Sequence, residues 1–288
     1  MPSSPIPPYV GRIAPSPTGY LHLGHAQTFR IAHQRARAAG GKLIFRMEDL
    51  DGPRCRQEFA AAAIDDLKWF GLDWDEGPDI GGPHAPYLQS QRLSIYREAL
   101  DQLIRADLVY PCTCSRKDIQ TAVSAPNEGD EEPVYPGHCR NRTAKDAPEK
   151  GRFNWRFRVR DNETTTFIDA GFGPQSFTAG KHFGDFVVWR HDGIPSYQLA
   201  VVTDDFLMGI TEVVRGADLL VSTARQILLY RALGATPPTF HHCELVRVAK
   251  GVRLAKRHGS LSLRSRRKLD ADPELLGNIS GKPDSNCC

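Results

Sequence analysis

The sequence lacks the features that would place the protein in a membrane or in an oxidising compartment. No run of about 18 apolar residues occurs among its 288 residues, so we expect no transmembrane segment. Residues 1–8 are rich in proline and carry no charge, unlike a secretory signal peptide. The seven cysteines are too irregularly spaced for a disulfide framework. These absences predict a cytoplasmic protein with no membrane partner.

An excess of charge of one sign is also missing. The 37 basic and 34 acidic residues leave a net charge of +3, so the composition neither indicates nor excludes a nucleic-acid partner. The two common phosphate-binding loops are absent as well, because neither Gly-x-Gly-x-x-Gly nor Gly-x4-Gly-Lys-Ser/Thr occurs. A phosphate site in this protein must therefore be built in another way.

Apolar spacing in the first hundred residues indicates alternating strands and helices. Residues 10–14 and 42–47 are typical of short buried strands. Helical patterns follow at 26–39, ended by Gly40 and Gly41, and at 58–70 and 93–108. Strand and helix in alternation predict an α/β fold with a Rossmann-like, doubly wound parallel sheet.

A segment of different composition interrupts this pattern after residue 110. Residues 111–152 are rich in proline, charged residues and cysteine, and short strands are expected at 153–159 and 186–189. The alternation resumes with a helix at 196–206, a strand at 210–215 and a helix that Ser222 or Thr223 caps and that ends at Leu233. We predict a Rossmann-like main domain at 1–110 and 181–270, an insertion at 111–180 and a disordered tail at 278–288.

Two histidines follow the first predicted strand at the start of the first helix. His22 and His25 are three residues apart, which places both imidazoles on one face of the first turn. Gly24 leaves room above that turn for a flat ring or a phosphate, and a helix N-terminus attracts phosphate. Two imidazole donors there would stabilise charge in phosphoryl or nucleotidyl transfer. Two surface histidines beside a helix cap are the simpler alternative.

The residues around this pair resemble a known family. RIAPSPTGYLHLGH (12–25) resembles the His-Ile-Gly-His signature of class I aminoacyl-tRNA synthetases, and its first eight residues resemble the glutamyl and glutaminyl branch. FRMEDLD (45–51), SYQLAVVTDD (196–205) and ITEVVRGADLL (210–220) resemble further blocks of that branch. The resemblance covers residues 9–269 and implies that the main domain is catalytic and activates glutamate with ATP.

A second signature of this family is matched with changes. RLAKRHGSLSL (253–263) resembles Lys-Met-Ser-Lys-Ser, but Arg253 replaces the first lysine and Ala255 replaces the first serine, whereas Lys256 keeps the second lysine. A basic surface loop is the alternative. The resemblance implies that His22, His25 and Lys256 are catalytic and neutralise the phosphates. It assigns ATP, accompanied by magnesium, to His22, Gly24, His25 and Lys256.

Arginines at two strand ends suit a dicarboxylate substrate. Arg12 and Arg215 lie at the same edge if the sheet is parallel, and a guanidinium binds a carboxylate through two hydrogen bonds. By resemblance, Arg12 and Tyr197 hold the side-chain carboxylate of glutamate, Arg215 the backbone carboxylate and Glu48 the ammonium group. The predicted glutamate site comprises Arg12, Ala14, Ser16, Glu48, Tyr197 and Arg215.

The cysteines of the insertion form a candidate zinc site. Cys112 and Cys114 open the insertion, and the next cysteine in the chain is Cys139. Three thiols in a loop-rich segment predict a structural zinc ion, for which His138 is the ordinary fourth ligand. The Cys-x-Cys…Tyr-x3-Cys pattern, however, resembles a shortened glutamyl-synthetase paralogue with a tyrosine ligand. We predict the set Cys112, Cys114, Tyr135 and Cys139, with His138, or metal-free thiols, as alternatives.

The short stretch of chain after the second signature indicates which enzyme of the glutamyl and glutaminyl branch the chain resembles. Glutamyl-tRNA synthetases continue into an anticodon-binding domain, and about 25 residues are too few for one. The chain thus resembles the shortened paralogue that activates glutamate without tRNA and esterifies it to queuosine at the wobble position of tRNA(Asp). Expected partners of a monomer are the queuosine-bearing anticodon arm of tRNA(Asp), L-glutamate and ATP. A catalytic fragment of a glutamyl-tRNA synthetase and a non-catalytic tRNA-binding or regulatory paralogue are the alternatives.

Overall fold

The structure is a computed structural model that describes residues 8–115, 117–119, 134–245 and 262–269. Its chain divides into two compact units, which are described separately. The first unit takes the described parts of Met1–Gln91, Gly209–Asp218 and Pro238–Cys288, and the second takes those of Arg92–Met208 and Leu219–Pro237. None of the helices in these residues has the length and apolar character needed to cross a membrane.

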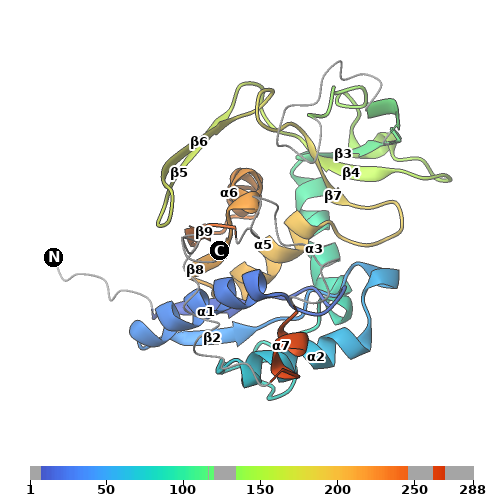
Figure 1. The fold of residues 1–288 in the computed structure, drawn as a ribbon. Helices are drawn as coiled ribbons and strands as arrows, with labels where there is room; N and C mark the ends of the chain where they lie inside the picture. The colour runs from blue at the N-terminus through green and yellow to red at the C-terminus, as the bar shows by residue number, and fades with distance from the viewer. Residues whose placement is uncertain (1–7, 116, 120–133, 246–261, 270–288) are drawn as a thin grey trace, which may run out of the picture. The chain divides into compact units, whose positions relative to one another are not determined.

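The first unit is built on parallel strands (Figure 1). Strand β1 (Val10–Ile13) pairs in parallel with β2 (Lys42–Phe45), and β8 (Glu212–Gly216) pairs in parallel with β9 (Thr239–Cys243). The N–H of Thr211 donates to the Val10 carbonyl at 2.8 Å, which ties the two pairs together. The helices of this unit are α1 (Leu23–Ala38), α2 (Gln57–Trp69) and α7 (Leu263–Arg267). The predicted strands at 10–14, 42–47 and 210–215 are confirmed.

Helix α1 packs closely on these strands because its inner face is built from alanines. Ala26, Ala32 and Ala36 are buried, and Ala32 contacts Val214 of β8 and Cys243 of β9. Small side chains let a helix backbone approach a sheet, and the apolar strand residues fill the core beneath it. This packing fixes the start of α1 above the carboxyl ends of β1 and β2.

The second unit contains antiparallel strands. It includes α3 (Leu93–Arg105), α5 (Tyr197–Leu207) and α6 (Leu220–Ala232), and a sheet in the order β3 (Val109–Cys112), β4 (Asn154–Phe157), β7 (Phe186–Trp189). A long curved hairpin joins β5 (Thr164–Asp169) to β6 (Gly173–Thr178) (Figure 1). In the residues that the structure describes, the fold is therefore α/β with mixed sheets, and parallel pairing joins β1 to β2 and β8 to β9.

The start of α6 differs from the prediction. The helix begins at Leu220, and Leu219 at its N-cap provides no side-chain hydrogen bond. Thr223 instead donates its hydroxyl to the Leu219 carbonyl within the first turn, and Ser222 accepts from Gln198. The prediction that Ser222 or Thr223 caps this helix is therefore wrong, because the helix starts before both residues: the Thr223 hydroxyl bonds within the first turn and that of Ser222 contacts Gln198 of α5. The predicted domain boundaries stay a prediction.

Candidate active site and metal centre

The two histidines of the opening motif lie against each other at the N-terminus of α1. His22 is the N-cap residue, and its Nδ1 accepts from the N–H of His25 at 3.4 Å. The two imidazole rings stack with centroids 3.6 Å apart and planes 20° apart. Because Nδ1 accepts a hydrogen bond, neutral His22 carries its proton on Nε2. The structure thus brings both imidazoles to the positive end of the helix dipole.

The chain beyond β1 runs beside the chain beyond β2, and this brings Glu48 to the turn after β1. The N–H of Glu48 donates to the Pro15 carbonyl at 2.9 Å, and that of Arg46 to the Ile13 carbonyl at 2.9 Å. Ala14 is partly buried in this stretch, and Ser16 is exposed, with its main-chain carbonyl accepting from the N–H of Thr18. Three of the predicted glutamate-site residues, Ala14, Ser16 and Glu48, therefore share one strand edge.

Glu48 is held by an arginine that the sequence analysis does not single out. The Arg46 Nη2 donates to Glu48 Oε1 at 3.0 Å, and the Arg46 side chain is fully buried. Only 9% of Glu48 is exposed. The spacing i, i+2 in an extended segment, which directs two side chains to one face, was the available signal in FRMED. The ion pair holds the Glu48 carboxylate in place at the edge of the site.

Arg12 and Arg215 are both fixed to β8 and its surroundings. Arg12 Nη1 donates to the carbonyl of Val214 at 2.9 Å. Arg215 Nε contacts His242 Nε2 at 3.2 Å. Each arginine is only 5% exposed. Arg12 thus contacts the main chain of the residue that precedes Arg215, and Arg215 contacts His242, which no sequence motif indicated.

The predicted site residues that remain are Tyr197, Lys256 and Gly24, one from the glutamate site and two from the ATP site. Tyr197 is the first residue of α5 in the second unit, where it is 39% exposed and follows the N-cap residue Ser196. Lys256, with Arg253 and Ala255 of the second signature, lies outside the described residues. Gly24 lies in the first turn of α1, where its carbonyl accepts from the Thr28 hydroxyl at 3.1 Å. The roles of these residues stay predictions.

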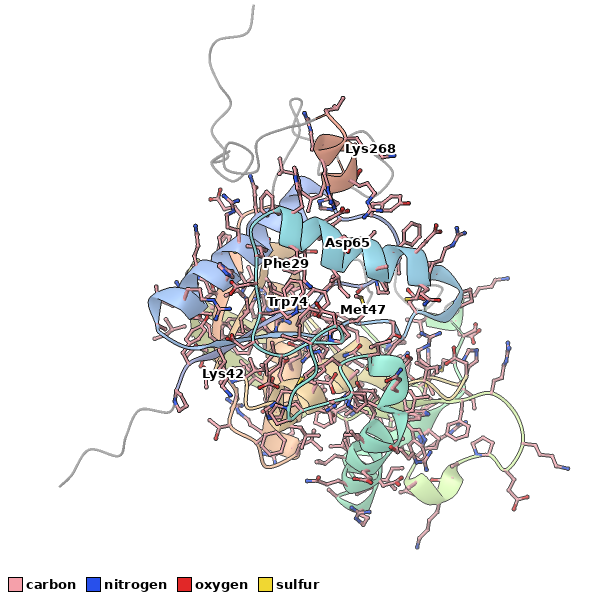
Figure 2. The ribbon with its side chains drawn as sticks, turned by 90° about the horizontal axis from the view of Figure 1, so that it is seen from below. Phe29, Lys42, Met47, Asp65, Trp74 and Lys268 are labelled. Carbon is pink, nitrogen blue, oxygen red and sulfur yellow. The ribbon has the colours of Figure 1, made fainter. Side chains whose placement is uncertain are left out.

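The last two residues of the second signature stretch lie beside the start of α1. Ser262 forms an antiparallel bridge with His22, and the N–H of Leu263 donates to the Leu21 carbonyl at 2.8 Å. Helix α7 then packs on α2, where Arg264 donates to the buried carboxylate of Asp66 at 3.1–3.3 Å. Figure 2 shows α7, which the labelled Lys268 follows directly, beside α2, which carries the labelled Asp65. The second signature therefore ends within reach of the histidine pair.

The second unit brings the three cysteines of the insertion together with a tyrosine. The Sγ atoms of Cys112, Cys114 and Cys139 all lie within 4.8 Å of one another, and those of Cys114 and Cys139 are 3.7 Å apart. The Tyr135 hydroxyl lies 3.4 Å from the Sγ of both Cys112 and Cys114. His138 is exposed and is not part of the cysteine group.

These separations fit a tetrahedral zinc ion. With Zn–S bonds of about 2.3 Å and a Zn–O bond of about 2.0 Å, sulfur ligands lie roughly 3.8 Å apart and oxygen and sulfur roughly 3.5 Å apart. The observed separations of 3.7 and 3.4 Å match both values. Three thiols and one phenol also form the four-donor set of a closed structural site. Cys112, Cys114, Tyr135 and Cys139 are therefore the residues that would hold the ion.

The cluster already favours one thiolate. Burial raises the pKa of Cys139, but hydrogen bonds from the backbone of Thr113 and from Tyr135 and Cys114 outweigh it and lower that pKa to about 7. Burial raises the pKa of Cys114 to about 11, and burial with hydrogen bonds to Cys112 and Cys114 raises the pKa of Tyr135. A bound cation would reverse these last two shifts, because it stabilises the deprotonated ligands.

The buried carboxylate of Asp185 connects the elements that carry this cluster. Asp185 accepts from the Tyr110 hydroxyl at 2.6 Å and from the N–H of Val159 at 2.8 Å, and it forms an ion pair with Arg140. The guanidinium of Arg156 lies 4.1 Å from the ring centroid of Tyr135. These contacts join β3, β4 and the chain before β7, so the sheet holds the cysteine-bearing segments in place.

The chain matches the model of the family "tRNA synthetases class I (E and Q), catalytic domain" over residues 9–280. It is 50% identical over 274 residues to the glutamyl-Q tRNA(Asp) synthetase of Nitratidesulfovibrio vulgaris, covering 94% of this chain and 84% of that protein. It is 52% identical to the protein of the same name from Symbiobacterium thermophilum, covering 94% of this chain and 85% of that one.

Glutamate–tRNA ligases are similar over a smaller part of their length. The ligase of Heliobacterium modesticaldum is 42% identical, with 93% of this chain and 55% of the ligase covered. The crystal structure of a glutamate tRNA ligase from Elizabethkingia meningosepticum in complex with its amino acid is 32% identical, with a TM-score of 0.76 over 88% of this chain and 52% of the ligase. The chain thus spans about half the length of these ligases.

Proposed function

Because the chain belongs to the class I tRNA synthetases of the glutamyl and glutaminyl type, and is therefore a ligase, we propose that it activates L-glutamate with ATP in the absence of tRNA. The glutamate is then transferred to queuosine at the wobble position of tRNA(Asp), bound through its anticodon arm. The protein works as a monomer in the cytoplasm.

The observation that carries the first step is that Arg12, Glu48 and Arg215 all lie at or just beyond strand ends of the first unit. All three are buried and sit at or just beyond the carboxyl ends of parallel strands. Glutamate carries two carboxylates and one ammonium group, and the group offers two guanidinium ions and one carboxylate. This match of charge supports an amino-dicarboxylate substrate, because each charged group of the ligand finds an opposite charge.

The activation step requires positioning rather than a protein nucleophile. A carboxylate oxygen of glutamate attacks the α-phosphorus of ATP, the bond from that phosphorus to the bridging oxygen breaks, and pyrophosphate leaves with the electron pair. His22 and His25 at the N-terminus of α1 would neutralise charge that develops on the phosphates, together with Lys256. Magnesium accompanies the nucleotide and shields its phosphates.

The transfer step uses the adenylate as an acyl donor. A hydroxyl oxygen of queuosine attacks the activated carbonyl, an ester forms, the hydroxyl proton is lost and AMP leaves. The support for this acceptor is the similarity to proteins named glutamyl-Q tRNA(Asp) synthetase, which are matched over 84–85% of their length at 50–52% identity. The glutamate–tRNA ligases are matched over about 55% of theirs.

A structural zinc ion, one per chain, completes the proposal. Cys112, Cys114, Tyr135 and Cys139 would hold it, and the ion supplies folding energy to a loop-rich segment. Its role is structural, because four protein donors leave no open position on the ion for a substrate or water.

The test is ATP–pyrophosphate exchange with a panel of amino acids, first without tRNA. Exchange with glutamate alone supports the proposal. Exchange that appears only after addition of tRNA(Glu) favours the catalytic part of a glutamyl-tRNA synthetase, and no exchange under either condition favours a non-catalytic tRNA-binding or regulatory paralogue. Transfer is then followed with radiolabelled glutamate and tRNA(Asp) with and without queuosine, and only the modified tRNA is expected to be labelled.

A further inference from the structure

We propose that His242 is a positioning residue that orients Arg215 for the backbone carboxylate of the amino acid. This inference rests on the proposed function, and it adds a residue that belongs to neither signature motif. His242 lies on β9 directly opposite Arg215 of the parallel strand β8. Its Nε2 lies 3.2 Å from Arg215 Nε, and only 1% of its surface is exposed.

The chemistry of the two groups fixes the direction of this hydrogen bond. A guanidinium is always charged and only donates, so Arg215 Nε is the donor and His242 Nε2 the acceptor. Neutral His242 must then carry its proton on Nδ1. A protonated imidazole would lose the acceptor and place two cations side by side in a buried site.

A hydrogen bond at Nε determines how the guanidinium plane is turned. Nε is the donor nearest the side-chain stem, so holding it fixes rotation about the last flexible bonds and presents Nη1 and Nη2 as a pair. The guanidinium also lies 5.7 Å from the ring centroid of Phe240, two residues before His242 on β9. The rings of Phe240 and His242 are 21° from parallel. One face of β9 therefore supports Arg215 at two points.

Arg12 is oriented by a different device. Its Nη1 donates to the main-chain carbonyl of Val214, which no side-chain substitution removes. Arg215, the residue that follows Val214, depends on a side chain from the neighbouring strand. Substitution of His242 should therefore change the orientation of Arg215 but not that of Arg12. It should affect the binding of only one carboxylate of the substrate.

The experiment compares His242→Leu, which removes the acceptor at similar volume, with His242→Gln, whose amide oxygen can accept near the position of Nε2. The readout is the KM for glutamate and the KM for ATP in pyrophosphate exchange without tRNA. We expect His242→Leu to raise the KM for glutamate by about tenfold or more, the scale of one charged hydrogen bond, with the KM for ATP within about twofold. His242→Gln should recover most of the loss.

Equal losses for both substrates, an unchanged KM for glutamate in His242→Leu, or a His242→Gln variant no better than His242→Leu would overturn the inference. Nitrogen NMR of the full chain gives an independent readout of His242, with a proton expected on Nδ1; a proton on Nε2 also overturns it. If the wild-type chain shows no pyrophosphate exchange with any amino acid tested, the proposed function fails. The NMR result alone then decides the Arg215–His242 arrangement.

Discussion

His22 and His25 stack at the start of α1, with ring centroids 3.6 Å apart. His22 also caps the helix through Nδ1. The same His22 side chain therefore orders the first turn and stacks on the ring of His25. The pair is fixed at the end of the helix where the helix dipole favours an anion. This relationship supports an ATP phosphate as the ligand of the turn.

Removing the second imidazole should slow adenylate formation. We expect His25→Ala to reduce glutamate-dependent pyrophosphate exchange by about tenfold or more, since it removes one positioned donor to the phosphates. His33→Ala is the matched control, because His33 lies on the same helix and pairs with Asp73. His22→Ala also removes the cap, at a cost of about 0.5–2 kcal/mol, and His22→Asn restores it. Unchanged exchange in His25→Ala contradicts the ATP assignment.

The metal site predicts different outcomes for neighbouring substitutions. We expect about one zinc ion per purified chain by elemental analysis, and its loss in Cys139→Ser. Tyr135→Phe should weaken zinc retention against a chelator, because it removes the oxygen that lies 3.4 Å from two Sγ atoms. His138→Ala is the control and should retain zinc, because His138 is exposed. Zinc retained in Tyr135→Phe but lost in His138→Ala would reverse the ligand assignment.

Glu212 should give stability that depends on pH. It accepts from the Tyr9 hydroxyl at 2.7 Å and from two nitrogens of Arg35 at 2.6 and 2.7 Å. Burial raises the pKa of Glu212, but the hydrogen bonds from Arg35 and Tyr9 outweigh it, so the pKa in the folded state is lowered from 4.5. A lowered pKa means that stabilisation is complete above the unfolded value and is lost as the pH falls through the folded value.

We therefore expect Glu212→Gln to reduce the free energy of unfolding by about 1–2 kcal/mol at pH 7. The difference from the wild-type chain should shrink as the pH falls below about 4.5, the unfolded pKa of glutamate. Urea unfolding across this pH range measures it. A difference that stays constant down to the acid limit would mean that the ionised carboxylate is not what stabilises the fold.

The buried pair of Arg46 and Glu48 should be costly to break. Arg46→Met leaves the Glu48 carboxylate without the contact at 3.0 Å, and we expect a loss of about 3–5 kcal/mol in urea unfolding. Adding Glu48→Gln should restore part of it, because the buried charge is then removed. Arg54→Met is the control: its side chain is 74% exposed, and the effect should be below about 0.5 kcal/mol. A double variant no more stable than Arg46→Met contradicts this account.

Much of the first unit and both candidate sites could be predicted from local sequence. The apolar runs that form β1, β2 and β8 and the His22–His25 spacing act over a few residues, so they are visible in the chain itself. The strands β3, β5, β6 and β9 were not predicted. The β5 segment, for example, begins with three threonines and exposes Ile168, so no apolar alternation marks it.

The sequence by itself determined which chemical groups are available: guanidinium ions at strand ends, imidazoles at a helix start and thiols with a nearby tyrosine. Only the tertiary structure decided which partner holds each of them. Arg215 meets His242 across 27 residues, and Tyr9 meets Glu212 across 203. Such pairs follow from strand register and helix packing, which depend on the whole core and leave no periodic signal in the sequence.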